Sequence, residues 1–425
     1  MNPMRQARDG APYYAASAGP TRPFPRLVEG IKADICIIGG GFTGLSAALH
    51  LGEAGVCVSL VEAEAVGFGA AGGQIHTGLR QDRLEKQLGA GRARALWDLT
   101  EESKTLVHAL VEKHAIDCAL KSGLAIAAHN ERAARALAAD TERLARVYGY
   151  SRAQMMGRAA TAQKLGTEIY AAARYDEGGG HLQPLSFARG LAGAADKAGA
   201  TIWEHSPALH IGRSKRGAVV RCSQGGNVTA DCVIIACGAY SGSIAPRLAR
   251  TIGQIRSHVV ATAPLGAKLS REILPSDVAV ADTRHMLDYY RKSSDGRLIF
   301  AGGETPLRAA SDVAGLVRPQ MLRVFPQLAD IPIEFAWSAT VGITRTGLPH
   351  FGKLSDRVFF AHGYSGQDVS LAVLGGKLLA EAAMGNSERF DVFARLPTKI
   401  FPGGAVLRKP LLGLALRAMK RADAA

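Results

Sequence analysis

Three glycines with one or two residues between them follow an apolar run and open a helix-like segment in IIGGGFTGLSAAL. Gly39 permits a tight turn, Gly41 lets phosphates reach the backbone, and Gly44 lets the helix pack on the preceding strand. The first turn, with Phe42 and Thr43, presents unpaired N–H groups and a partial positive charge. The spacing therefore predicts a nucleotide diphosphate across the start of this helix.

A carboxylate ends the next apolar run. Glu62 lies 18 residues after Gly44, beside Ala63, and can accept hydrogen bonds from both hydroxyls of a ribose. Strand, helix and strand in this order predict a βαβ unit. The alternative is a glycine-rich turn with a surface glutamate. The motif alone leaves NAD and FAD open.

The rest of the chain falls into segments with helical and segments with strand-like hydrophobic periodicity. Helical spacing dominates residues 90–150, and strand patterns dominate 255–340. We expect an α/β fold with a discontinuous nucleotide-binding domain and a second domain on a mixed or antiparallel sheet. The expected boundaries are 31–85, 180–250 and 345–400 for the first domain, 86–179 and 251–344 for the second, 1–30 for an N-terminal arm and 401–425 for a tail.

The net charge, the cysteine spacing and the length of the apolar stretches indicate which binding partners to expect. The net charge is +14, but no basic run or zinc-finger pattern indicates nucleic acid. Six cysteines without CxxC spacing favour a reduced, cytoplasmic chain with no metal site. No apolar stretch is long enough to span a bilayer. The tail PLLGLALRAMKRADAA either lies on a membrane surface or, as we expect, docks on the protein or frays.

Several further motifs carry a resemblance to a known family. The chain resembles the FAD-dependent amine and amino-acid oxidoreductases of the D-amino-acid oxidase/glycine oxidase superfamily, and within it the gamma-glutamylputrescine oxidoreductase branch. The similar segments occur in the same order: YYAASAGP, GGGFTGLSAAL, VGFGA, GGQIHTG, DYYRKSSDGRLIFAGG, LPHFGKL, GYSGQDVSLAVLGGKLLAEA and LPTKIFPGG. The resemblance implies a Rossmann-like FAD domain and a substrate domain.

The resemblance also implies further cofactor contacts. It places adenine at Pro207 and Ala208, and the flavin beside a glycine-ended strand and several loops: Gly69, Ala70, Gly73, Gln74, Ile75, Gly238, Gly342, Gly363, Tyr364, Ser365, Gly366 and Gln367. The amides and helix dipole after Gly363 could stabilise negative charge on the reduced flavin; the alternative is a glycine-capped helix start. Two segments depart from the branch: the loop 69–74 is three residues shorter, and Asp368 stands where the branch commonly has glycine.

Five residues are candidates for the reaction site. Tyr289 and Arg291 share one face of a strand, opposite Tyr290. Arg345 could hold a carboxylate bidentately, His76 could lie near the flavin, and Trp337 could form a wall. Core packing is the alternative for the tyrosines, His76 and Trp337, and a surface charge is the alternative for Arg345.

The implied chemistry is oxidation of a C–N bond in a small amine or amino acid, possibly gamma-glutamylputrescine-like, by hydride transfer to flavin N5. We expect noncovalent FAD, because no cysteine follows Cys237 to form a C-terminal link. The electron acceptor is O2 or another compound. The alternatives are a quinone-linked dehydrogenase at the membrane surface and a catalytically silent flavin-binding subunit. The oligomeric state stays open.

Overall fold

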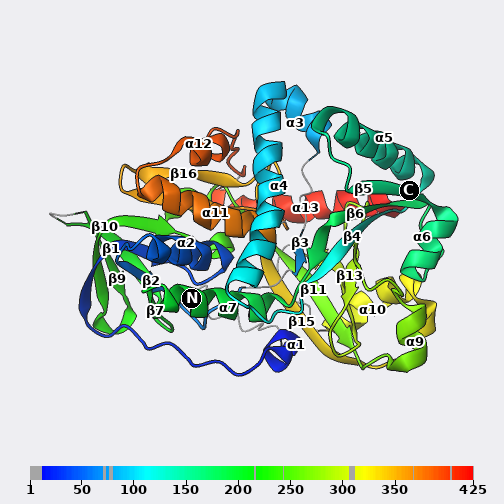
Figure 1. The fold of residues 1–425 in the computed structure, drawn as a ribbon, viewed down its shortest axis with the longest axis horizontal. Helices are drawn as coiled ribbons and strands as arrows, with labels where there is room; N and C mark the ends of the chain where they lie inside the picture. The colour runs from blue at the N-terminus through cyan, green and yellow to red at the C-terminus, as the bar shows by residue number, and fades with distance from the viewer. Residues whose placement is uncertain are drawn as a thin grey trace.

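Two sheets lie side by side in this computed structural model, on the left and right of Figure 1, and helices pack against both. The structure describes residues 12–69, 73–75, 80–214, 217–242, 244–305, 312–366, 368–402 and 404–424. Within these ranges the helices are α1 (Pro12–Ser17), α2 (Phe42–Glu53), α3 (Gln81–Leu88), α4 (Ala90–Lys113), α5 (Glu131–Tyr148), α6 (Arg158–Leu165), α7 (Pro184–Lys197), α8 (Pro246–Ala249), α9 (Gly266–Glu272), α10 (Val313–Val324), α11 (Asp368–Ala383), α12 (Glu388–Ala394) and α13 (Gly404–Ala424).

The first sheet has a parallel centre in the order β7-β2-β1-β10-β17. Its central strands are apolar and buried on both faces, as parallel strands covered by other elements must be. Antiparallel strands extend it on both the β10 and the β17 sides. Its members are β1 (Gly30–Ile38), β2 (Val58–Val61), β7 (Thr201–Trp203), β8 (Ala208–Arg213), β9 (Ala218–Cys222), β10 (Asn227–Ile235), β16 (His350–Ser355) and β17 (Val358–His362).

The second sheet is mixed, since only the β4–β12 pair is parallel among its described pairs. This arrangement confirms the predicted fold class. Its order is β15-β11-β14-β13-β12-β4-β6-β3, with β5 beside β6. Its members are β3 (Gln74–Ile75), β4 (Lys121–Ala128), β5 (Ala153–Gly157), β6 (Ala172–His181), β11 (Gly253–Thr262), β12 (Ala279–Asp282), β13 (Tyr289–Lys292), β14 (Leu298–Thr305) and β15 (Ile333–Ile343).

Small residues let two helices approach closely over the first sheet. Helix α2 packs between α11 and α7. A Cβ added to Gly376 of α11 would lie 2.3 Å from the Thr43 carbonyl oxygen, so glycine is required there. The Ser46 hydroxyl donates to the Val373 carbonyl at 2.6 Å, which joins the same two helices. The opposite face of the sheet is covered by the β8–β9 hairpin and α8.

The sequence patterns predicted many of the helices and strands but missed others, among them elements of eight to twelve residues. The two amphipathic helices expected in 90–150 are α4 and α5. Strands β4, β5 and β6 were not predicted, nor was α10 inside the strand-rich segment. Strand β3 lies in the segment assigned to the first domain but pairs with β6 in the second sheet. The domain boundaries themselves stay a prediction.

The C-terminal helix α13 packs against β11 and β14 of the second sheet. Near its end, the Asp423 carboxylate accepts the backbone N–H groups of His285 and Met286, each at 2.8 Å. Along α13, Leu411, Leu414 and Met419 are exposed. In the part of the chain that the structure describes, no helix has both the length and the apolar character needed to cross a membrane.

Two histidines, of which His362 is buried and His350 is partly buried, make the first sheet sensitive to acid. His350 Nδ1 lies 3.0 Å from His362 Nε2, and Thr251 Oγ1 contacts both rings. Burial lowers the pKa of His350 to about 4, and burial together with His350 lowers the pKa of His362 to about 3. Folding therefore requires both rings to stay neutral at pH values where an unfolded histidine, with a pKa near 6.5, binds a proton.

We predict that the free energy of unfolding falls as the pH drops below about 6.5, because the unfolded chain takes up protons that the folded chain rejects until about pH 4. The loss between pH 7 and pH 5 should be about 2 kcal/mol from each ring, or about 4 kcal/mol from the pair. Urea denaturation at both pH values measures it. His362→Gln should flatten the dependence, whereas the exposed control His210→Gln should not; equal slopes in the two variants would refute the assignment.

Candidate functional site

The glycine fingerprint forms the turn between β1 and α2, and each glycine has a different reason to lack a side chain. Gly39 has φ +113°, and a Cβ there would lie 2.6 Å from the Ala236 carbonyl oxygen. A Cβ on Gly44 would lie 1.9 Å from the Gly39 carbonyl oxygen. A Cβ on Gly41 would meet no described atom within 4 Å. Two of the glycines thus serve packing, and the third borders open space.

That open space lies at the start of α2. Gly41 is the N-cap residue, and no side chain caps the helix. The first-turn N–H groups, including those of Phe42 and Thr43, therefore have no intrahelical acceptor and point toward a ligand position. A diphosphate supplies the negative charge and the acceptors that such a turn needs. The arrangement fits a dinucleotide cofactor.

Glu62 lies beside this turn, at the end of β2. Its Oε2 accepts the Gly40 N–H at 2.5 Å, and its Oε1 accepts the Glu64 N–H at 2.9 Å. Burial raises the pKa of Glu62, and these two hydrogen bonds oppose the rise. The carboxylate is thereby fixed in orientation, and its remaining lone pairs are available to hydroxyl donors.

A cavity of about 90 Å³ adjoins Glu62. The predicted residues Gly39, Glu62, Ala63 and Ala208 all line it. Sequence reasoning did not select its other lining residues, among which are Phe68, Cys237, Tyr240 and Ile244. Burial, with Glu62 nearby, raises the pKa of the Cys237 thiol to about 12, so this thiol stays protonated. Pro207 precedes the cavity wall, and its carbonyl accepts the Ser223 N–H at 3.0 Å.

The loop between β17 and α11 is joined to the fingerprint helix. The Tyr364 hydroxyl lies 2.8 Å from Thr43 Oγ1. Ser365 has φ +57°, a strained value for a residue other than glycine, between Gly363 at +74° and Gly366 at +92°. The strain is held by specific bonds, because Ser365 Oγ accepts the Thr344 N–H and donates to the Gly363 carbonyl, both at 3.2 Å.

Two further predicted glycines meet this loop. The Gly342 carbonyl, in β15, accepts the Ser365 N–H at 3.2 Å. A Cβ on Gly342 would lie 3.3 Å from Ala239 Cα, in the turn that begins at Gly238. Gly238 has φ +52° and open space around it. The fold thus brings the fingerprint, the turn after β10, the end of β15 and the loop before α11 into one region.

The shortened loop between β2 and β3 is described in part. Gly69 is exposed, Gly73 and Ile75 are buried, and the Gln74 side chain donates to the Val280 carbonyl at 3.0 Å. A Cβ on Gly73 would lie 3.2 Å from Arg291 Nη2. Ala70, His76 and Gln367 fall outside the described residues, as does the side chain of Asp368.

The reaction-site candidates separate into two places. Tyr289 and Arg291 face the layer that contains Trp337, whereas Tyr290 faces the core on the other side of the sheet, as the strand pattern predicts. Arg345 is exposed, and its guanidinium donates to the Ile400 carbonyl at 3.0 Å.

Residues that the sequence analysis did not select also reach this layer. Tyr14, from α1, packs edge-on against Trp337 with ring centroids 5.3 Å apart, and its ring lies 5.8 Å from Arg291 Cζ. His181 ends β6, and burial, together with Arg291, lowers its pKa to about 4. The only sequence signal for Tyr14 was its place in the segment YYAASAGP.

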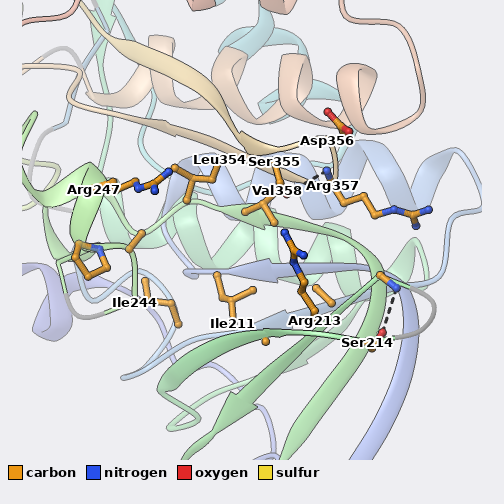
Figure 2. A pocket seen from close by; sticks show the side chains of 15 residues that line it. Ile211, Arg213, Ser214, Ile244, Arg247, Leu354, Ser355, Asp356, Arg357 and Val358 are labelled. Atoms are coloured by element: carbon orange, nitrogen blue, oxygen red, sulfur yellow. Dashed lines mark hydrogen bonds between the residues drawn. The ribbon is translucent and has the colours of Figure 1, made fainter.

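A larger, open cavity of about 530 Å³ lies on the far side of Ile244. Figure 2 shows its lining, which comes from β8, β9, the turn before α8 and the turn between β16 and β17. Arg213, Arg247 and Arg357 are exposed at its edge. None of the predicted site residues that the structure describes lines it, although Ile244 borders both this cavity and the one at Glu62.

Comparison with known proteins places this geometry in a family. The family model described as FAD dependent oxidoreductase, DAO, matches residues 34–382. The chain belongs to this family, and it is an FAD-dependent oxidoreductase of amines or amino acids. The family assignment therefore identifies FAD as the cofactor of this chain.

Individual relatives agree with this assignment. The chain is 37% identical over 409 residues to gamma-glutamylputrescine oxidoreductase of Escherichia coli (strain K12), covering 95% of each protein. Glycine oxidase from Bacillus cereus ATCC 14579 has a TM-score of 0.71 at 20% identity, with 86% of this chain and 99% of that chain covered. L-Amino acid deaminase from Proteus myxofaciens in complex with anthranilate has a TM-score of 0.71 at 15% identity, with 87% and 94% covered. The two solved structures show the fold.

A pair of alanine substitutions separates packing from ligand binding. We predict that Gly41→Ala leaves the unfolding midpoint of the apoprotein nearly unchanged, because its methyl group meets only open space at an allowed backbone conformation. The same methyl group would occupy the position of the diphosphate, so flavin content should fall at least about tenfold. The visible absorbance ratio of the purified protein measures this loss.

Gly44→Ala is the matched comparison. Its methyl group would lie 1.9 Å from a backbone oxygen, so we expect loss of folded protein or a clearly lowered unfolding midpoint. A Gly41→Ala variant that retains full flavin content would show that no diphosphate lies over α2.

Proposed function

We propose that this chain oxidises the C–N bond of a small amine that resembles gamma-glutamylputrescine. The observation that carries the proposal is the identity of 37% to that oxidoreductase, because it extends over 95% of both chains and so includes the second sheet. Bound FAD would accept a hydride from the carbon beside the amine, and water would then hydrolyse the resulting imine.

The residues of the chain would orient the two reactants. The loop from Gly363 to Gly366, with the N-terminus of α11, would face the flavin pyrimidine and stabilise negative charge there. Its attachment to Thr43 and Gly342 supports this role, since both anchors belong to elements of the FAD region. Tyr289, Arg291 and Trp337 would position the amine from the second sheet.

The proposed enzyme is cytoplasmic, and it passes electrons from the reduced flavin to O2 or another acceptor. The exposed Leu411, Leu414 and Met419 of α13 favour, as the second candidate, electron transfer to a membrane quinone. Deleting 410–425 would then abolish co-sedimentation with vesicles while leaving flavin reduction intact.

The reaction is tested by anaerobic flavin bleaching. We expect gamma-glutamylputrescine to bleach the visible flavin band, with glycine, sarcosine and putrescine reacting more slowly, because the 37% relative is named for the first compound. Bleaching by none of these amines would contradict the proposal and favour a silent flavin-binding subunit.

The mode of cofactor attachment has a separate test. We expect acid precipitation to release all FAD into the supernatant, because no cysteine follows Cys237 in the sequence. Yellow colour or flavin fluorescence that stays with the precipitate and survives washing would show a covalent link instead.

A further inference from the structure

The open cavity of about 530 Å³ is a cleft between two hairpins, and we call it the hairpin cleft. One wall is the β8–β9 hairpin, and the other is the turn between β16 and β17 (Figure 2). Both hairpins pair with one strand, since Ala218 lies opposite Ala230 of β10 and Val358 lies opposite Val233. Because these two partners are three residues apart in β10, the walls start about 10 Å from each other.

Both walls are fixed to β10, so the width of the hairpin cleft is set before any ligand binds. A Cβ on Gly217, immediately before β9, would lie 2.4 Å from the Ala230 carbonyl oxygen, so only glycine allows this approach. On the other wall, the Val233 N–H donates to the Arg357 carbonyl at 2.8 Å, and Arg357 Nη1 donates to the Asp231 carbonyl at 3.4 Å. A site that is already formed loses little entropy on binding.

The floor of the hairpin cleft is aliphatic. The side chains that form it also belong to the hydrophobic cluster between the β8–β9 hairpin and the first sheet. They are the buried Ala218 and Ala245 and the half-buried Ile211, Ile244, Leu354 and Val358. A ligand with an apolar or aromatic body would cover the half-buried members and remove their surface from water, which stabilises the complex.

Three arginines from three separate segments surround this floor. Arg213 ends β8, Arg247 lies in α8, and Arg357 lies in the turn before β17. Figure 2 shows Arg213 between the two hairpins, with Arg247 and Arg357 to either side. Asp356 alone is acidic among the described residues that line the hairpin cleft, so three positive charges accompany one negative charge.

The positive charge of the rim is not cancelled inside the chain. Among the described residues, no ion pair involves Arg213 or Arg247. A single exposed arginine without an acidic partner is ordinary, because water solvates it. Several guanidinium groups around one apolar cleft differ, since walls of low dielectric constant focus their field on the space between them. The hairpin cleft therefore attracts a ligand with more than one negative charge.

The kind of cation and the shape of the cleft narrow the class of ligand. Every cationic residue in the described lining is arginine, which binds phosphate through paired N–H groups and stacks on flat rings, whereas lysine acts as a point charge. A fatty acid has one carboxylate, and its chain would stay partly exposed in an open cleft. A nucleoside phosphate has a flat base for the floor, a polar ribose for the open side and several charges for the rim.

We propose that the hairpin cleft binds a nucleoside phosphate, with the phosphates on Arg213 and Arg247 and the base on the aliphatic floor. The inference goes beyond the proposed function, because it concerns neither the amine nor the flavin. Ile244 lines both the hairpin cleft and the cavity at Glu62, so the bound nucleotide and the cofactor would lie on either side of this side chain. The experiment must therefore separate the two positions.

The test is a calorimetric titration of the purified holoenzyme with ADP at low salt concentration. Ultrafiltration before and after the titration measures whether ADP has released any FAD. Adenosine lacks the phosphates and pyrophosphate lacks the nucleoside, so these two compounds test the floor and the rim separately. The variants are Arg213→Gln, Arg213→Lys and Arg247→Gln, and the control is Arg146→Gln, which changes an exposed arginine of α5.

We expect ADP to bind saturably without releasing FAD, and at least about tenfold more tightly than adenosine or pyrophosphate, because only ADP uses both the floor and the rim. Arg213→Gln should weaken ADP binding by about tenfold and Arg247→Gln by about threefold. Arg213→Lys, which keeps the charge without the planar fork, should give a smaller loss than Arg213→Gln. Arg146→Gln should change the dissociation constant by less than about twofold.

Five results would overturn the site. The first three are no saturable binding of ADP at millimolar concentrations, ADP binding that releases FAD in proportion, and equal weakening in Arg213→Gln and Arg146→Gln. Pyrophosphate that binds as tightly as ADP would leave an anion site at the rim alone, and decanoate that binds more tightly than ADP would assign the cleft to fatty acids. If Arg213→Gln does not fold, Arg213→Lys and Arg247→Gln still decide. A lack of amine bleaching would refute the proposed reaction without altering these affinities.

Discussion

The approach of α2 to the end of β1 is the constraint on which the site depends. Glycine alone allows this contact, because a methyl group at Gly44 would lie 1.9 Å from the Gly39 carbonyl oxygen. The contact directs the uncapped first turn of α2 toward the carboxyl ends of β1 and β2. Glu62 ends β2 at this point, so a cationic helix end and an oriented carboxylate lie on either side of one open space.

The second sheet brings a different set of residues to the same region. Its strands bring Tyr289, Arg291 and Trp337 to one face, and β15 also carries Gly342 to the loop that Ser365 holds in a strained conformation. In the proposed function, the first sheet holds the nucleotide, and the second presents side chains to the reacting end of the cofactor. Helix α1 joins them, because Gln183 at the start of α7 binds its backbone while its rings pack on β15.

The elements with strong local patterns could be predicted from the sequence. The run from β1 to Glu62, the helices α4 and α5, and the strands β11, β13, β14 and β15 all follow from periodicity and glycine placement. Strand β6, AARYDEGGGH, could not, because three glycines and no clear alternation conceal a strand whose pairing with β4 and β5 is tertiary. Arg345 shows a related limit, since the carbonyl that its guanidinium binds belongs to Ile400, 55 residues further along the chain.

The proposed cofactor site requires a nucleotide diphosphate bound over α2, with its ribose on Glu62. Competition of ADP against FAD for the apoprotein tests this directly, because ADP carries the diphosphate and the ribose without the flavin. We predict that ADP displaces FAD, that riboflavin does not, and that Glu62→Gln weakens ADP binding about tenfold or more. Riboflavin competing as well as ADP, or ADP affinity unaffected by Glu62→Gln, would contradict the account.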